Sequence, residues 1–237
     1  MNKGTYISAV ILTYNEQEHI TRCVKSLHGV ADQVIVLDSN STDNTVAICN
    51  DLGVEVVNTI WKGYAKTKNL GNKEAKYDTI LSIDADEELS NELIASILAQ
   101  KRNGFSENDV YKFHRLNNYC GQWIRHAGWY PDTKVRIFNR QNTRWEGDVH
   151  EHLVYTIPVN ETLLSGDMLH YSIKDKADHI ARIKKYNLLA RKYPNRLVAF
   201  LSAISTFVKL YIIKRGFLEG KLGYQLCSIS AKAKIWR

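Results

Sequence analysis

Two acidic residues stand two positions apart directly after an apolar run. The run Thr79–Ile83 predicts a β-strand, and Asp84 and Asp86 follow it. If strand geometry persists there, both carboxylates point the same way. Two converging carboxylates repel each other unless a cation lies between them, and hard oxygen ligands suit Mg²⁺ or Mn²⁺, which also bind a diphosphate. Acids can also simply end a strand and begin a capped turn, so the pair alone is a weak signal.

Two further polar clusters follow apolar runs in the same way. The run Tyr6–Thr13 leads into Thr13–Glu16, and the run Gln33–Asp38 leads into Ser39–Asp43. A carboxylate at Asp38 can accept hydrogen bonds from a base imide or a ribose. Asp, Ser and Asn are also common in turns and helix caps for local reasons, so both interpretations stay open for this cluster.

Strands and helices that alternate over the first hundred residues must position these clusters. A further strand is expected at Val54–Val57, and helices at Glu16–Leu27, after a cap at Thr42–Asp43, at Tyr64–Ala75 and from the Ser90 cap through Leu98. Such a βαβ series predicts an α/β fold, with a Rossmann-like, mainly parallel sheet and helices on both faces. Ligands bind beyond the carboxyl ends of such strands. The three polar clusters should therefore meet at one edge of the sheet.

The pattern changes after residue 110. Short β-like runs at Val110–His114, Lys134–Phe138 and Leu153–Tyr155 predict a mixed, partly antiparallel region that forms the second wall of a cleft. A helix is expected over Asp178–Lys192, ended by Pro194.

Composition excludes few classes of protein. With 44% hydrophobic and 24% charged residues, the 237-residue chain is ordinarily globular. The four cysteines are far apart and never in CxxC spacing, which fits free thiols in a reducing cytosol. His150 and His152 lack evident third and fourth zinc ligands. The N-terminal apolar run is short and lacks a cleavage site, so no signal peptide is expected.

The three clusters together resemble a known family. Ile11–Glu16, Leu37–Thr45 and Asp84–Glu87 occur in the order and at the spacings typical of family 2 glycosyltransferases of the GT-A fold. The resemblance covers nearly the whole chain and is sharpest with a subgroup that decorates the lipopolysaccharide inner core. The segments that resemble this subgroup are Trp61–Asn69, Val135–Phe138, Val149–Glu151 and Arg215–Gly220.

The resemblance implies roles for individual residues. Asp84 and Asp86 would hold a Mg²⁺ or Mn²⁺ ion and the donor diphosphate. The residues expected to bind the nucleotide-sugar donor are Thr13, Tyr14, Glu16, Asp38, Lys68, Asp84 and Arg136. Many members carry a second acid after the first at the end of strand two, where this chain has Ser39, which leaves the base contact open.

The resemblance also implies that the reaction inverts the anomeric centre of the sugar. An inverting displacement needs a general base to take the proton of the acceptor hydroxyl, while the metal stabilises the leaving diphosphate. Glu151 is the candidate base, with Asp148 in reserve, and Asp86 is the other residue expected to act in catalysis. The alternative is that this segment is an exposed polar loop.

The tail carries the positive charge. Of the 32 Lys and Arg residues, ten lie in residues 191–237 beside a single acid, Glu219, whereas residues 1–190 hold 22 bases and 24 acids. Leu197–Ile213 is a mostly apolar run of 17 residues, short of the ~20 of a membrane-spanning helix. Its cationic flanks suit the surface of an anionic membrane, whereas the alternative is a helix buried on the catalytic domain. No nucleic-acid-binding module is recognisable.

We therefore expect a catalytic domain over residues 1–190, with a nucleotide-sugar half at about 1–105 and an acceptor half at about 106–190, and a basic helical tail over 191–237. The resemblance implies a reaction that moves a sugar, glucose from UDP-glucose, onto a lipid-anchored glycan, a heptose of the lipopolysaccharide inner core. The enzyme would lie on the cytoplasmic face of the cytoplasmic membrane.

Two rivals remain at this stage. A nucleotidyltransferase would carry a glycine-rich loop after the first strand, and Thr13–Glu16 has no glycine. A non-catalytic, membrane-bound carbohydrate-binding module would not need Asp84 and Asp86 together with Asp38.

Overall fold

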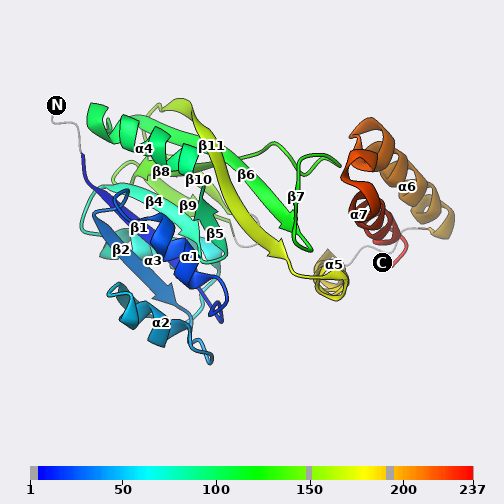
Figure 1. Cartoon of the computed structure of the whole chain (residues 1–237), viewed down its shortest axis with the longest axis horizontal. Coiled ribbons are helices and arrows are strands. Elements are labelled where there is room, and N and C mark those ends of the chain that lie inside the picture. Colours follow the sequence, from blue (N-terminus) through cyan, green and yellow to red (C-terminus); the bar gives the residue numbers. More distant parts are fainter. Residues whose placement is uncertain (1–4, 148–150, 191–194, 237) are drawn as a thin grey trace. The chain divides into compact units, whose positions relative to one another are not determined.

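The computed structural model describes residues 5–147, 151–190 and 195–236. The chain begins with β1 (Ile7–Thr13), α1 (Ile20–Ser26), β2 (Gln33–Asp38), α2 (Thr45–Asp51), β3 (Glu55–Asn58), α3 (Tyr64–Glu74), β4 (Thr79–Asp84), β5 (Glu87–Leu89) and α4 (Asn91–Asn103) (Figure 1). Six strands follow, namely β6 (Asp109–Tyr119), β7 (Gln122–Ile124), β8 (Asp132–Asn139), β9 (Thr143–Glu146), β10 (His152–Tyr155) and β11 (Asn160–Ile173). The described part of the chain ends with α5 (Lys176–Ala190), α6 (Arg196–Val208), a π-helical turn (Lys209–Ile213), a 3-10 turn (Gly216–Glu219) and α7 (Gly220–Lys232).

The main sheet has the strand order β3-β2-β1-β4-β8-β6-β11-β5, and β7 pairs with β6. Strands β3, β2, β1 and β4 are parallel, and β8 runs antiparallel to β4. The central strand β1 is buried along its whole length, as its continuous apolar run predicts for a strand covered on both faces. The predicted α/β architecture, with a mixed second half, is confirmed.

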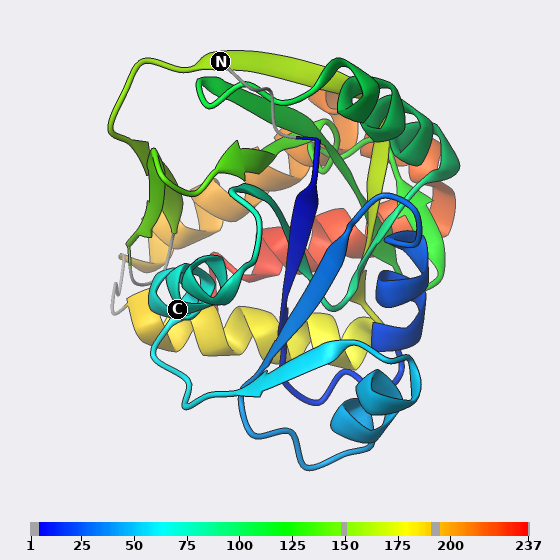
Figure 2. The same ribbon diagram turned by 90° about the vertical axis from the view of Figure 1, so that its left-hand side faces the viewer.

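Helices cover both faces of the parallel strands (Figure 2). Alternate residues of β1 contribute to two separate cores: Ile7, Ala9 and Ile11 pack with α1, whereas Val10 and Leu12 pack on the side of α3. Helix α3 approaches the sheet closely at Gly71, where an added Cβ would lie 2.8 Å from the Leu37 side chain and would also meet Val10. The missing side chain therefore sets the distance between α3 and the sheet.

Some predicted boundaries shift. Residues 16–19 form a turn before α1, in which the Glu16 carbonyl accepts the N–H groups of His19 and Ile20, so the helix begins later than expected. Ser90 caps α4 as predicted, with its hydroxyl accepting the Leu93 N–H at 3.2 Å, but the helix continues to Asn103. Pro194, expected to end the helix before it, lies outside the described residues.

The turn after β4 changes the geometry of the two acids. Strand β4 ends at Asp84, Ala85 and Asp86 form a turn, and β5 begins at Glu87. The condition under which both carboxylates would point the same way by strand alternation is therefore not met.

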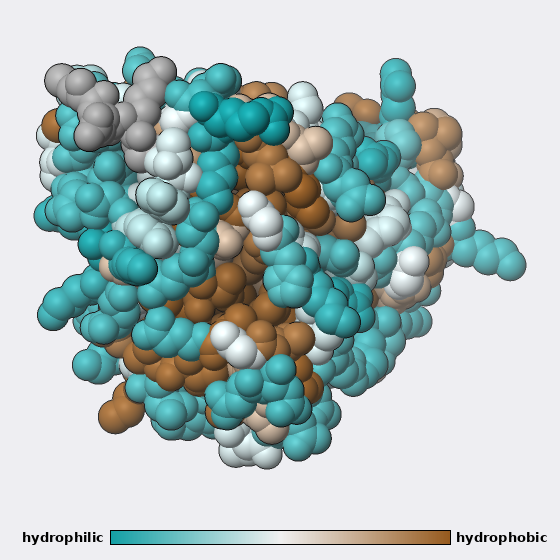
Figure 3. All heavy atoms as spheres, turned by 60° about the vertical axis from the view of Figure 1, so that its left-hand side comes forward, coloured by the Kyte–Doolittle hydropathy of each residue, from teal (hydrophilic) through white to brown (hydrophobic). Residues whose placement is uncertain are grey.

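The chain divides into two compact units. One contains the described residues up to His114 together with Thr133–Leu169, and the other contains Arg115–Asp132 together with the described residues from His170 onward. The boundary expected at residue 190 stays a prediction. On the face drawn in Figure 3, hydrophobic side chains gather in the middle and hydrophilic ones at the periphery.

The second unit has a core of its own, in which Tyr119, Ile124 and Ala127 pack with Leu226 and Cys227. Helix α6 packs against α7, and Gly223 allows α7 to approach the backbone at Gly216. With the π-helical turn, α6 gives one stretch of 18 residues, Arg196–Ile213, that is long and apolar enough to cross a membrane by length and composition alone. Only 11% of this stretch is buried.

Candidate active site at the carboxyl ends of the parallel strands

The loops that follow β1 and β2 are joined to each other by hydrogen bonds. Asn15 Oδ1 accepts the Thr42 N–H at 2.7 Å, the Asn15 N–H donates to Ser41 Oγ at 2.9 Å, and the Glu16 N–H donates to Thr45 Oγ1 at 2.8 Å. Asn15 has a φ of 55°, a left-handed conformation that asparagine tolerates better than most residues. The two strand-end loops therefore form one connected rim.

The same rim holds Asp43. Burial alone would raise the pKa of its carboxyl group, but hydrogen bonds from the side chain and N–H of Thr45 and from the Gln17 N–H outweigh that effect and lower the pKa. A carboxylate that stays ionised here fixes the entry into α2. The polar cluster after β2 thus serves local structure in part, as the turn alternative supposed. The helix cap expected at Thr42–Asp43 is wrong, because the N-cap of α2 is Asn44, which forms no side-chain cap hydrogen bond.

Thr13 and Asp38 lie opposite each other at the ends of β1 and β2. Asp38 is 1% exposed, and its Oδ2 accepts the Ser41 N–H at 2.9 Å. Asp38 Oδ1 and Thr13 Oγ1 are both buried without a hydrogen-bond partner among the described residues. Since buried polar atoms are nearly always paired, these two oxygens mark a place where a ligand can supply hydrogen-bond donors.

The other two residues expected in the nucleotide pocket lie on the rim. The Tyr14 side chain is 58% exposed. Glu16 Oε2 lies 2.8 Å from His19 Nδ1. Tyr14 can therefore meet a ligand without moving, whereas Glu16 is engaged by its own loop.

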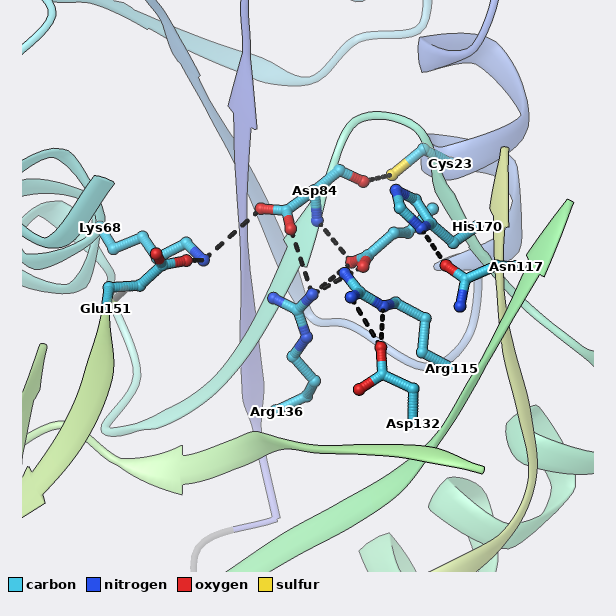
Figure 4. Close-up of polar contacts among 10 residues, drawn as sticks. Cys23, Lys68, Asp84, Arg115, Asn117, Asp132, Arg136, Glu151 and His170 are labelled. Carbon is cyan, nitrogen blue, oxygen red and sulfur yellow. Dashed lines mark hydrogen bonds and ion pairs between the residues drawn. The ribbon is translucent and has the colours of Figure 1, made fainter. Parts of the chain in front are cut away.

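Asp84 ends β4 and is paired with two cations (Figure 4). Its Oδ1 lies 3.6 Å from Lys68 Nζ and its Oδ2 lies 3.1 Å from Arg136 Nη2. In register Asp84 is opposite Leu12, whereas Asp38 is opposite the next residue of β1, Thr13. Because successive side chains of a strand point to opposite faces, the side chains of Asp84 and Asp38 lie at the same edge of the sheet but point toward opposite faces.

Arg136 forms a second, deeper contact with Glu87. Its Nη2 lies 2.6 Å from Glu87 Oε1, and the Glu87 side chain is fully buried. Glu87 Oε2 also accepts the Asp84 N–H at 2.9 Å. Burial alone would lower the pKa of Arg136, but Glu87 and Asp84 reverse that effect and raise it. Glu87 therefore holds both Arg136 and the backbone of Asp84 in place.

Sequence reasoning included Glu87 in the acidic segment but assigned it no role of its own. Its position directly after Asp86 in the acidic segment was the available signal, but only the fold shows that it points into the core while Asp84 stays partly exposed. The roles proposed for Asp84 and Arg136 thus depend on Glu87, whose contribution the sequence pattern did not reveal.

Lys68, on α3, contacts both Asp84 and the candidate base Glu151. This lysine is only 2% exposed, and its Nζ lies 3.0 Å from Glu151 Oε1 and 4.6 Å from the centre of the Trp145 ring. The Glu151 side chain is 23% exposed, so it remains accessible. Asp148, the reserve candidate for the base, and His150 lie outside the described residues.

Comparison with known proteins identifies the family of this chain. The family model for glycosyl transferase family 2 matches residues 8–159. This chain belongs to glycosyltransferase family 2. An uncharacterized glycosyltransferase of Rickettsia conorii, RC0292, is 48% identical over 267 residues, which covers 100% of this chain and 90% of that protein.

More distant relatives have narrower names. The lipopolysaccharide core biosynthesis glycosyltransferase LpsC of Rhizobium meliloti is 25% identical, covering 98% of this chain and 92% of that protein. Among solved structures, S. aureus TarS 1–349 matches with a TM-score of 0.50 and 16% identity, covering 97% of this chain and 80% of that chain, a likeness that shows the fold alone.

In this family 2 glycosyltransferase, the candidate donor and catalytic residues all fall inside the matched residues 8–159, whereas the basic tail lies beyond them. Family membership supports the glycosyltransferase prediction over both rivals, the nucleotidyltransferase and the non-catalytic module.

The carboxylates fit a divalent cation only in part. Within the described residues, no group of three or more His, Cys, Asp or Glu side chains could hold a metal ion. Mg²⁺ sites at phosphate substrates commonly use one or two carboxylates, with phosphate oxygens and water completing the shell. Asp84 and Asp86 match such a site in number and in ligand type, although the turn at Ala85 and Asp86 removes the strand alternation that would align their carboxylates.

Proposed function

We propose that this glycosyltransferase transfers glucose from UDP-glucose, with inversion, to a lipid-anchored glycan of the lipopolysaccharide inner-core type. The contact between Lys68 and Glu151 carries the catalytic part of this proposal. It brings the only candidate base among the described residues into one charged cluster with Asp84, the residue expected at the donor diphosphate.

The nucleoside end of the donor would bind at the ends of β1 and β2. The unpaired oxygens of Thr13 and Asp38 can accept hydrogen bonds from a base imide or a ribose hydroxyl. Tyr14, exposed on the rim, offers an aromatic face to the base.

The diphosphate would lie at Asp84 and Asp86, which would hold Mg²⁺ or Mn²⁺. When bound, the metal supplies Lewis-acid stabilisation of the leaving diphosphate. Lys68 and Arg136 add positive charge on the side of Asp84. Both cationic side chains are themselves buried and paired with carboxylates, so they need no rearrangement to face developing negative charge.

Glu151 would perform the proton transfer. It accepts the proton of the acceptor hydroxyl as that oxygen forms its bond to the anomeric carbon, and the bond between this carbon and the diphosphate breaks on the opposite side. The products are an inverted glycoside and UDP. Lys68 holds the Glu151 carboxylate in position through the 3.0 Å contact.

The acceptor is proposed on two grounds. The name of the relative LpsC refers to lipopolysaccharide core biosynthesis. The tail is basic, and its apolar stretch Arg196–Ile213 is largely exposed, which suits a substrate held in a membrane. We accordingly place the enzyme as a peripheral protein on the cytoplasmic face of the cytoplasmic membrane.

The donor is tested with a panel of nucleotide sugars and Mn²⁺, with release of nucleoside diphosphate as the measurement. We expect release from UDP-glucose that disappears in Asp84→Ala and Asp86→Ala and persists in Asp51→Ala, an exposed acid on α2. Pyrophosphate formation from a sugar phosphate and a nucleoside triphosphate would contradict the proposal.

The base and the acceptor need a second assay, with purified lipopolysaccharide core fragments. Glu151→Gln should bind UDP-glucose as tightly as the native protein but transfer no sugar. Turnover retained in this variant would refute the role of Glu151. Transfer to other glycans but not to core fragments would refute the acceptor while leaving the donor chemistry intact.

A further inference from the structure

One face of α6 is apolar and open to solvent. Leu201 and Ile204 are 56% and 48% exposed, and Leu197, Val208 and Ile212 are exposed at the same helical spacing. Residues three and four apart share one face of a helix. These side chains therefore form a continuous stripe along α6 and its π-helical extension, which we call the α6 stripe.

The opposite face of α6 is already used. Ala199 and Ala203 are buried, and the Phe207 ring lies 5.9 Å from that of Tyr224 on α7. Helices α6 and α7 pack side by side in the second unit (Figure 1). The α6 stripe is thus the outward side of a packed helix pair, and nothing in the second unit covers it among the described residues.

The exposed charges of the tail segment that carries the α6 stripe have one sign among the described residues. The only acid in residues 191–237 is Glu219, which is 7% exposed and accepts hydrogen bonds from Gln122 and from the ring and N–H of His126. The exposed charges of the described tail are cations, including Lys209, Lys214 and Lys221. The surface therefore presents apolar groups and positive charge together.

We propose that the α6 stripe and its neighbouring lysines dock onto an anionic lipid bilayer, with α6 lying in the plane of the surface. Exposed leucine, isoleucine and valine side chains would enter the boundary between headgroups and acyl chains. The lysines would meet the anionic headgroups. This surface stands on its own contacts and charges, and it adds to the proposed function the means by which the enzyme reaches a lipid-anchored acceptor.

The in-plane orientation follows from the packing of α6. A helix that crosses a bilayer exposes all of its faces to lipid or to other spanning helices, whereas α6 has one face packed against α7. Exposed Lys209 also lies inside the chain segment that would have to cross, at the fourteenth of its 18 residues. A charge within the apolar segment is costly in the hydrocarbon of a bilayer but favourable at its surface.

Two other occupants fit less well. A second copy of this chain would bring surfaces of like charge together. Nucleic acid would match the cations but would leave the apolar side chains of the α6 stripe without a partner.

Vesicle sedimentation tests the surface without donor or acceptor. We expect the full chain to bind vesicles of phosphatidylcholine with phosphatidylglycerol, and pure phosphatidylcholine vesicles at least about tenfold more weakly. Lys209→Gln with Lys221→Gln should weaken binding by about tenfold, whereas Lys25→Gln with Lys73→Gln, exposed lysines of the first unit, should leave it unchanged. High salt should release the protein.

The apolar part has its own matched pair of variants. Leu201→Glu with Ile204→Glu should abolish vesicle binding, whereas Leu163→Glu, at a comparably exposed leucine of β11, should not. UDP release in solution should be the same in all these variants, which separates failure of docking from failure of the proposed chemistry. The inference is overturned by equal binding to neutral vesicles, by resistance to alkaline extraction as for a spanning helix, or by a dimer that Leu201→Glu dissociates.

Discussion

Lys68 Nζ lies 3.0 Å from Glu151 Oε1 and 3.6 Å from Asp84 Oδ1. A single buried ammonium group therefore contacts both the carboxylate at the end of β4 and the carboxylate proposed as the general base. The indole of Trp145 covers the ammonium group. Positioning of the proposed base and charge balance at the proposed diphosphate site therefore depend on the same side chain.

Replacement of this lysine should affect turnover more than stability. Lys68→Met keeps the length and removes the charge, and we expect kcat/KM for UDP-glucose to fall by about tenfold to a hundredfold, the equivalent of the ~1.5–3 kcal/mol of a hydrogen bond to a charged group. Lys73→Met, on the exposed side of the same helix, should keep native kinetics. Native kinetics in Lys68→Met would show that the contact has no catalytic consequence.

The buried pair of Arg136 and Glu87 should dominate the electrostatic part of stability. Arg136→Met leaves the fully buried Glu87 without its guanidinium partner, and we expect the free energy of unfolding in urea to fall by about 3–5 kcal/mol. Arg144→Met, which removes an exposed partner of Glu146, should cost no more than about 1 kcal/mol. The double variant Glu87→Met with Arg136→Met should recover part of the loss, and a further loss would contradict this account.

Metal binding should depend on the donor. Asp84 is already paired with two cations, so we expect Mn²⁺ alone to bind weakly and UDP to strengthen its binding, as measured by calorimetry. Asp84→Asn and Asp86→Asn should each remove this coupling, and chelation of the metal should stop UDP release. Strong Mn²⁺ binding without UDP would instead indicate a preformed metal site.

Glu219 should give the second unit a pH-dependent stability. Burial alone would raise the pKa of its carboxyl group, but hydrogen bonds from His126, the Arg125 N–H and Gln122 hold it below the ordinary 4.5. A lowered folded-state pKa stabilises the fold above the ordinary value, and this contribution is lost as the pH falls through the folded-state value.

Glu219→Gln should therefore destabilise the protein at neutral pH by about 1.5–3 kcal/mol. The difference between native and variant proteins should shrink below pH 4.5, which urea unfolding at a series of pH values can follow. A difference that is constant over the whole pH range would show that the carboxylate charge does not contribute.

The sequence predicted the fold where hydrophobic periodicity and strand-end polarity act locally. The runs that end at Thr13, Asp38 and Asp84 became neighbouring parallel strands because apolar runs of that length bury on both faces. The same pattern could not show that Asp38 and Asp84 leave the edge toward opposite faces, because that depends on register between strands far apart in the sequence.

The sequence pattern could not predict the charged contacts of the site either. Lys68 and Glu151 are separated by 83 positions, and only tertiary packing brings them together. Spacing did not distinguish Glu87 either, because only its burial, and not its residue type, sets it apart from the partly exposed acids around it. The roles proposed for Thr13, Asp38, Asp84, Asp86 and Glu151 remain predictions for the experiments above.

The close approach of α3 to the sheet at Gly71 has a chemical consequence. Gly71 lies less than one helical turn beyond Lys68, and no larger residue fits against Leu37 and Val10. A single extra methyl group there would push the helix outward and move the ammonium group away from Asp84, although no charged residue had changed. The position of the Lys68 charge in the site thus depends on steric fit, because Gly71 has no Cβ on the side of α3 that faces the sheet.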